Sequence, residues 1–220
     1  AKELKAEGAM TVLLKDAIKP NLVQTLEHTP AIIHGGPFAN IAHGCNSVIA
    51  TKLGMELAEY TVTEAGFGAD LGAEKFIDIK CRKAQIKPDV VICVATIKAL
   101  KYHGGVPKEE ILNENIEALK KGMKNLYKHI DNLKNIFGKN VIVAINKFNT
   151  DTEVELNYLK EELSKRNIEV SIVESWAKGG NGAIDIAKKI VNMPESQTIK
   201  YCYDLNDSIV DKVKKVAQNV

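Results

Sequence analysis

Short apolar runs alternate along this chain with longer amphipathic stretches. The runs have the length of β-strands and lie at residues 31–34, 60–64, 89–95, 141–146 and 170–174. Two of them, 89–95 and 141–146, are continuous and rich in Val and Ile, which is typical of central parallel strands covered by helices on both faces. The stretches between the runs predict helices at residues 47–58, 71–84, 108–137, 153–166 and 182–191.

This alternation predicts an α/β fold built on a doubly wound, mostly parallel sheet with right-handed crossovers. Residues 1–30 are expected to form a connecting segment with helical pieces, because a helical stripe ends at Pro20. Residues 31–193 are the predicted α/β core. Residues 194–220 are predicted to be a linker and a last amphipathic helix, which either covers an edge of the core or begins another domain.

Composition narrows the class of protein. With 45% hydrophobic and 26% charged residues, the chain is expected to be soluble and globular. A net charge of +2 without a basic block argues against a nucleic-acid partner. No apolar run has the length of a membrane span and the N-terminus has no signal-peptide core, so we expect no membrane association and a cytoplasmic location. The four cysteines lack C-x-x-C spacing, which favours reduced, buried thiols over a zinc site.

The loop at residues 34–47 carries the densest set of unusual residues. It reads His-Gly-Gly-Pro-Phe-Ala-Asn-Ile-Ala-His-Gly-Cys-Asn-Ser, between an apolar run and a predicted helix. A turn placed there gathers free backbone N–H groups and the positive end of the helix dipole, so it suits an anion. Gly35 and Gly36 permit close approach of a ligand, whereas an ordinary capped turn is the structural alternative. His34 and His43 are either proton carriers or hydrogen-bond partners of the backbone.

In open α/β sheets, ligands bind beyond the carboxyl ends of the strands. Glu64 and Asp70 frame a glycine-rich turn after the second apolar run, where one or two carboxylates suit Mg²⁺. The alternative is that Asp70 caps a helix and Glu64 is a surface charge.

Two further strand ends carry aromatic and polar side chains. Phe148 and the one tryptophan of the chain, Trp176, follow successive predicted strands, so the two rings could enclose a planar ligand. The alternative is that one ring closes the end of the sheet as part of the core. Neighbouring polar residues resemble the purine-contacting segments of nucleotide-binding P-loop proteins; they are Asn146, Lys147, Ser175 and Lys178.

Four segments together resemble one enzyme family. They are residues 13–26, the loop at 34–47, the glycine-rich segment at 63–76 and the segment Val-Ala-Thr-Ile-Lys-Ala-Leu-Lys-Tyr-His-Gly-Gly at 94–105. In this order they closely resemble formate–tetrahydrofolate ligase, also called formyltetrahydrofolate synthetase, over nearly the whole chain. The resemblance implies a P-loop NTPase-like sheet, incomplete in this chain, and ATP-dependent ligation of formate to tetrahydrofolate through formyl phosphate. It also implies Mg²⁺, a monovalent cation (K⁺ or NH₄⁺) and a homotetramer.

The resemblance assigns roles to the candidate residues. The loop at 34–47 would hold formate or formyl phosphate through Gly35, Gly36, Asn40 and His43. The residues assigned to catalysis are His34, Glu64 and Asp70, of which the two carboxylates would also hold the metal. Phe148 and Trp176 would clamp the pterin ring of the folate, while Lys98 and Lys101 would neutralise phosphate or the carboxylates of the folate tail. Asn146, Lys147, Ser175 and Lys178 would form the nucleotide corner.

The chain departs from the family pattern at three points. Lys98 stands where Arg is expected, and His28 stands where Gly is expected. No G-x-x-x-x-G-K-[ST] motif occurs, so we expect a fragment that is inactive alone. The alternatives are a non-catalytic folate-binding or assembly module, and another nucleotide-dependent carboligase of the same superfamily, such as one resembling dethiobiotin synthetase.

Overall fold

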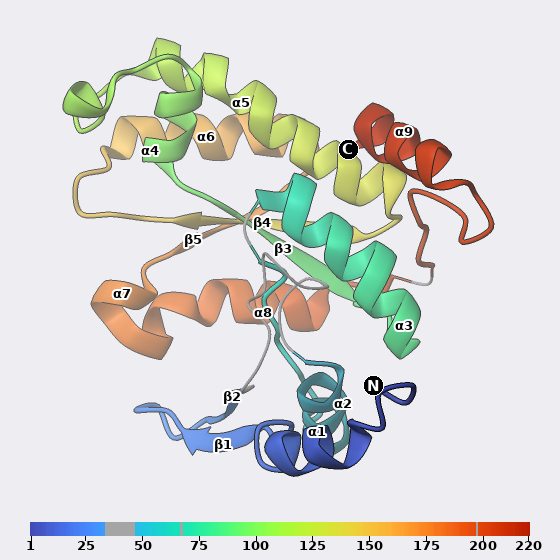
Figure 1. Cartoon of the computed structure of the whole chain (residues 1–220). Helices are drawn as coiled ribbons and strands as arrows, with labels where there is room; N and C mark the ends of the chain where they lie inside the picture. Colours follow the sequence, from blue (N-terminus) through green and yellow to red (C-terminus); the bar gives the residue numbers. More distant parts are fainter. Residues whose placement is uncertain (34–46, 67, 197) are drawn as a thin grey trace. The chain divides into compact units, whose positions relative to one another are not determined.

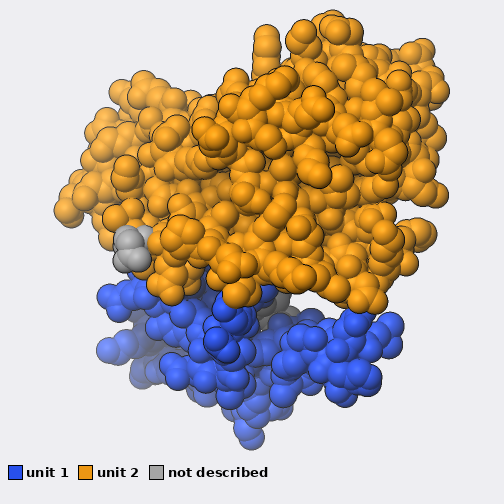
Figure 2. Space-filling model, turned by 180° about the vertical axis from the view of Figure 1, so that it is seen from behind, with its two compact units in different colours: residues 1–86 blue, residues 87–220 orange. Residues whose placement is uncertain are grey.

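The structure is a computed structural model that describes residues 1–33, 47–66, 68–196 and 198–220. The chain divides into two compact units, Ala1–Ile86 and Lys87–Val220, which are coloured separately in Figure 2. We describe each unit by itself and call them unit 1 and unit 2. The domain boundaries expected near residues 30 and 193 stay predictions from the sequence.

Unit 1 opens with a helix and a short antiparallel hairpin. Helix α1 spans Glu7–Leu14, and strands β1 (Asn21–Gln24) and β2 (Pro30–Ile33) pair from Asn21↔Ile33 to Gln24↔Pro30. The predicted strand at 31–34 therefore exists, but its partner is an antiparallel neighbour. In the hairpin turn His28 has φ 61°, a left-handed conformation that Gly adopts without strain. This geometry explains why the family pattern predicts Gly at that position.

From residue 47 on, the described residues of unit 1 are helical apart from one extended stretch. Helix α2 (Val48–Leu57) begins at Ser47, whose hydroxyl accepts a hydrogen bond from the Ala50 N–H at 3.1 Å. The strand predicted at 60–64 is wrong: Val62 is 81% exposed, and the stretch pairs with no strand in the described part of the chain. β-Branched composition alone does not make a strand that lacks a partner.

A helix of mixed α and π turns closes unit 1, as η1 (Gly68–Ala73), η2 (Phe76–Cys81) and α3 (Arg82–Ala84), close to the predicted 71–84. A Cβ on Gly72 would lie 2.5 Å from the Ala65 carbonyl oxygen, so the preceding turn packs directly on this helix. The Lys80 ammonium is buried in this unit and donates a hydrogen bond to the Thr51 hydroxyl at 2.8 Å.

Unit 2 contains the parallel sheet that the sequence predicts. Strands β3 (Val90–Ala95), β4 (Asn140–Asn146) and β5 (Glu169–Val173) lie in the order β3-β4-β5, and both pairings are parallel. Four of the five predicted strands therefore exist, three of them in this parallel sheet, and the mixed α/β class is confirmed. The P-loop NTPase-like type stays a prediction.

Helices cover both faces of this sheet (Figure 1). Helices α4 (Ile97–His103), α5 (Ile116–Asp131) and α6 (Glu153–Lys165) lie on one face, and α8 (Ile184–Asn192) lies on the other. Ile142 and Ala144 of β4 pack against Ile186 of α8. Because side chains alternate along a strand, the intervening β4 residues point to the opposite face of the sheet. Short helical segments complete the connections; they are η3 (Lys108–Glu110), η4 (Asn132–Ile136), α7 (Ser175–Lys178) and η5 (Gly179–Ala183).

Two predictions about unit 2 need correction. The helix predicted from residue 108 begins at Ile116, because the Asn115 side chain caps it by accepting from the Ala118 N–H at 2.9 Å. The segment Ile97–His103, where the sequence predicted no helix, is a helix that crosses α5 closely. A Cβ on Gly122 would lie 1.8 Å from the Leu100 carbonyl oxygen. The crossing therefore depends on glycine.

The C-terminal helix α9 (Ile209–Asn219) is hydrogen-bonded at its carboxyl end to α5 and η4. Lys128 Nζ donates to the Asn219 carbonyl oxygen at 2.8 Å, and the Asn132 amide donates to the Val220 carbonyl oxygen at 3.1 Å. Cys81, Cys93 and Cys202 are buried, whereas Cys45 lies outside the described residues. Among the helices described, none combines the length and the apolarity that a membrane crossing requires.

Candidate functional site at the carboxyl edge of the parallel sheet

The carboxyl ends of β3, β4 and β5 lie along one edge of the sheet in unit 2, on the left of Figure 1. The three strands lead respectively into α4, the loop before α6, and α7. Asn146 pairs with Val173, so Phe148 and Trp176 follow paired positions by two and three residues. Parallel pairing thus brings the two aromatic segments to neighbouring places on this edge.

Phe148 is held by its backbone and is partly open to solvent. Its N–H donates to Asp151 Oδ2 at 2.8 Å, and its side chain is 40% exposed. Lys98 Nζ, from the first turn of α4, lies 4.5 Å from the centroid of the Phe148 ring. Burial raises the pKa of the Asp151 carboxyl, while the Phe148 N–H and the Lys98 charge act in the opposite direction. The Asp151 carboxylate therefore holds the Phe148 backbone, and the Lys98 ammonium lies over the Phe148 ring.

Trp176 lies on the four-residue helix α7 and is 91% exposed. The backbone around it is nevertheless fixed, because the Glu174 N–H donates to the Gly182 carbonyl oxygen at 3.0 Å. A Cβ on Gly182 would lie 2.4 Å from the Glu174 carbonyl carbon, so only glycine allows this approach. The structure therefore presents a large apolar ring to solvent on a constrained segment.

Glu174 links the two aromatic segments through charge. It pairs with Lys178 at 2.6 Å and with Lys147 at 3.9 Å, and Lys147 also pairs with Glu153 at 2.8 Å. The hydrogen bond from Lys178 lowers the pKa of Glu174, and the hydrogen bond to Glu153 raises the pKa of Lys147. Both lysines assigned to the nucleotide corner thus have carboxylate partners. Asn146 is half-buried at the end of β4, and Ser175 is exposed.

Lys101 occupies the interior and not the ligand-facing edge. Its ammonium is 1% exposed, lies 2.9 Å from Glu155 Oε1 and donates to the Asn113 carbonyl oxygen at 2.8 Å. Burial acts to raise the pKa of Glu155, but hydrogen bonds from the Asn115 N–H, Lys101 and the Thr152 N–H hold it below its usual value. We therefore do not retain Lys101 as a folate contact.

The remaining candidates belong to unit 1. Glu64 and Asp70 are exposed, and Asp70 lies in the first turn of η1. The candidates of the glycine-rich loop lie outside the described residues; they are His34, Gly35, Gly36, Asn40 and His43. Within the described ranges, no three His, Cys, Asp or Glu side chains are close enough to hold a metal ion.

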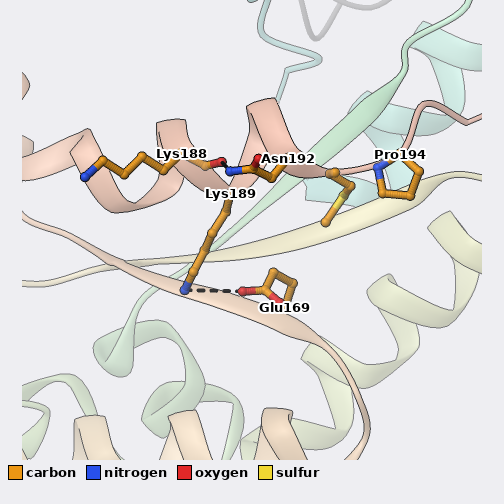
Figure 3. A pocket seen from close by; sticks show the side chains of 6 residues that line it. Glu169, Lys188, Lys189, Asn192 and Pro194 are labelled. Carbon is orange, nitrogen blue, oxygen red and sulfur yellow. Dashed lines mark hydrogen bonds and ion pairs between the residues drawn. The ribbon is translucent and has the colours of Figure 1, made fainter.

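A surface hollow elsewhere in unit 2 is lined by Glu169, Lys188, Lys189, Asn192, Met193 and Pro194. Figure 3 shows Lys189 reaching toward Glu169, and the two charged groups are 3.3 Å apart. Glu169 is the first residue of β5, so the hollow is at the amino end of that strand. Ligands of parallel sheets bind beyond the carboxyl ends, and we assign no ligand to this hollow.

The comparison with protein families agrees with the motifs. A family model described as formate–tetrahydrofolate ligase matches residues 1–220. The chain belongs to this family. The resemblance identified from the four segments is therefore confirmed, and the family is that of an ATP-dependent ligase that joins formate to tetrahydrofolate. The roles of individual residues stay proposals.

Sequence reasoning missed the carboxylates that organise this edge of the ligase fold. Glu155 was detectable, because Thr152 and Glu155 have the spacing of a capping box, and both capping hydrogen bonds are present. Glu174 follows an apolar run directly, which placed it at the right edge, and its i,i+4 spacing to Lys178 indicated one lysine partner but not Lys147. Asp151 lies only three residues after Phe148, yet its bond to the Phe148 N–H depends on the turn between them.

Proposed function

We propose that this chain serves a ligase that activates formate as formyl phosphate and transfers the formyl group to tetrahydrofolate. We further propose that the carboxyl edge of the sheet in unit 2 binds the pterin between Phe148 and Trp176. The observation that carries this assignment is the 91% exposure of Trp176 on a fixed segment that follows the strand paired with that of Phe148.

The exposure of Trp176 has a cost that a ligand can offset. Burying a Trp removes about 150–250 Å² from water, which at about 25 cal/mol per Å² corresponds to roughly 4–6 kcal/mol. A planar ring stacked on it would recover part of this, with about 0.5–1.5 kcal/mol more from offset stacking. A pterin is flat and carries polar edges, so it suits two rings at a polar strand edge.

The proposed chemistry proceeds in two displacements. A formate oxygen attacks the γ-phosphorus of ATP and ADP leaves, giving formyl phosphate. N10 of tetrahydrofolate then attacks the formyl carbon, phosphate leaves with the C–O bonding electrons, and N10 loses its proton. Orientation is the main contribution required of the protein, because both steps join bound reactants. A clamped pterin fixes the position of N10.

Other residues enter this proposal with narrower roles. The loop at 34–47 remains the proposed formate and formyl phosphate site. Asn146 and Ser175 remain proposed for the nucleotide corner. Lys147 and Lys178 also remain proposed for that corner. Both are paired with Glu174, so either lysine would have to exchange this carboxylate for a phosphate in order to bind the nucleotide.

Magnesium would neutralise phosphate charge when bound, and the proposal keeps Glu64 and Asp70 as its carboxylates. The donors among the described residues do not by themselves make a metal centre, so no step above depends on one. Homotetramer formation and stimulation by K⁺ or NH₄⁺ stay expectations from the resemblance.

Steady-state kinetics of the complete enzyme test the clamp. Trp176→Ala should raise the KM for tetrahydrofolate by about 10- to 100-fold, the equivalent of losing about 1.4–2.7 kcal/mol of stacking and burial, and change the KM for ATP little. Trp176→Phe, which keeps an aromatic face, should recover part of the loss. A defect confined to ATP would place adenine between the rings and contradict the proposal.

A further inference from the structure

We propose that Lys98 is a positioning residue that orients the Phe148 ring for the pterin and does not itself bind the carboxylates of the folate tail. This inference rests on the proposed function and deepens it. It replaces the role that the sequence suggested for Lys98 with one based on its observed contacts.

The first observation is the place of Lys98 on its helix. Thr96 caps α4 and accepts a hydrogen bond from the Ala99 N–H at 3.1 Å, so Lys98 is the second residue of the first turn. The amino end of a helix carries partial positive charge, and a lysine there is unfavourable without compensation. A position of this kind calls for a partner that stabilises the ammonium.

The second observation is that the compensation comes from the segment after β4. Lys98 Nζ lies 4.5 Å from the Phe148 ring centroid, within the range of a cation–π interaction. The Lys98 charge also acts on the Asp151 carboxyl, which accepts the hydrogen bond from the Phe148 N–H. One cation thus acts on both the ring and the anchor of its backbone, and the lysine is half-buried in doing so.

These contacts define what Lys98 does to the ring. The ammonium occupies the vicinity of one face of Phe148, so a planar ligand is directed to the opposite face. A cation on one face also draws π-electron density toward itself, which makes the other face a better partner for an electron-rich reduced pterin. Lys98 thereby fixes which face of the ring is available.

The position is also compatible with arginine, which the family pattern predicts there. A guanidinium stacks on aromatic rings and keeps its charge, so it can take the same place over Phe148. Methionine has similar length and no charge. The pair of substitutions Lys98→Arg and Lys98→Met therefore separates charge over the ring from simple side-chain volume.

The test is a set of calorimetric titrations of the full-length protein with tetrahydrofolate and with tetrahydropteroate, which lacks the glutamate tail. Lys98→Met should weaken both ligands by about 3- to 10-fold, and Lys98→Arg should stay within about 2-fold of the unmodified protein. Lys108→Met, at an exposed lysine of η3, is the matched control and should change neither affinity. In a Phe148→Leu background, Lys98→Met should cause no further loss.

The contradicting results are distinct. A loss of affinity for tetrahydrofolate alone would mean that Lys98 contacts the tail and would overturn the positioning role. An undiminished effect of Lys98→Met in the Phe148→Leu background would overturn it as well. If Phe148→Leu by itself left both affinities unchanged, the pterin assignment would fail, whatever Lys98 does.

Discussion

The substitution Glu155→Gln tests whether Lys101 has a structural role, through its buried ion pair with Glu155, or a ligand-binding role. It keeps the shape of the side chain but removes the charge opposite Lys101. At 2.9 Å, the attraction between the two charges is about 6 kcal/mol for an effective dielectric constant near 20. Desolvation of both groups offsets much of this, and removing one member of a buried pair costs about 3–5 kcal/mol.

The expected loss for Glu155→Gln is about 3 kcal/mol, at the lower end of that range, because the amide oxygen still accepts hydrogen bonds. Against a typical free energy of unfolding of about 5–15 kcal/mol, this is a large change. Urea unfolding followed by circular dichroism at pH 7 measures it. Glu161→Gln is the matched control, since Glu161 is an exposed residue of the same helix and its substitution should change stability by less than about 0.5 kcal/mol.

The pH dependence gives a second readout of the same pair. The pKa of Glu155 in the folded protein lies below its usual value of 4.5. As the pH falls through 4.5, the unfolded state therefore binds a proton before the folded state does. The stabilisation is complete above about pH 4.5 and is lost as the pH falls below it. Equal stability of the Glu155→Gln and Glu161→Gln variants at pH 7 would refute the buried pair and return Lys101 to the ligand-binding candidates.

Three other predictions follow from unit 1, the helix crossing and the missing motif. Burial and the neighbouring Asp78 raise the pKa of Glu74 to about 7, so the stability of the protein should fall as the pH rises from about 4.5 to about 7. Glu74→Gln should remove this pH dependence. In urea unfolding it should stabilise the protein by up to about 3 kcal/mol at pH 8 and leave it unchanged at pH 4.5. Equal gains in stability at both pH values would contradict the raised pKa of Glu74. Gly122→Ala should lower the free energy of unfolding by about 1–3 kcal/mol, because the added Cβ would overlap the Leu100 carbonyl oxygen. An unchanged melting temperature would disprove the close crossing of α4 and α5. The 220-residue chain alone should form no 10-formyltetrahydrofolate from formate, ATP and tetrahydrofolate, because it contains no G-x-x-x-x-G-K-[ST] motif; turnover in a coupled assay would contradict this.

The sequence predicts the parallel sheet because two of its runs have the composition of strands that are covered on both faces. The runs that became β3 and β4 are continuous and rich in Val and Ile, a pattern that a helix surface does not produce. The run at 60–64 has similar composition, but pairing depends on a partner that local sequence does not specify. Helix α4 was missed because Lys98 and Lys101 were interpreted as ligand-binding cations, whereas Lys101 is buried and paired with Glu155 of the distant helix α6.

The site was predictable in position but not in its contacts. Phe148 and Trp176 follow strand ends, and parallel pairing alone brings them to one edge. The ring partner of Lys98 and the Glu174 partner of Lys147 come from other segments, so spacing along the chain does not reveal them. The pair of Lys178 with Glu174 has i,i+4 spacing, but only the helix α7 makes that spacing a contact. The four loop residues assigned to formate and the catalytic candidate His34 all lie within residues 34–46, outside the described part of the chain.

Fluorescence of Trp176 tests the pterin clamp most directly, because it is the one tryptophan of this chain and is 91% exposed. The ligand is a reduced folate analogue that does not absorb at the emission wavelength of tryptophan. Titrated into the chain, it should shift the emission to shorter wavelength and change its intensity in a saturable way, since stacking removes the indole from water. ATP alone should leave the emission unchanged. A saturable response to ATP, with none to the folate analogue, would contradict the assignment.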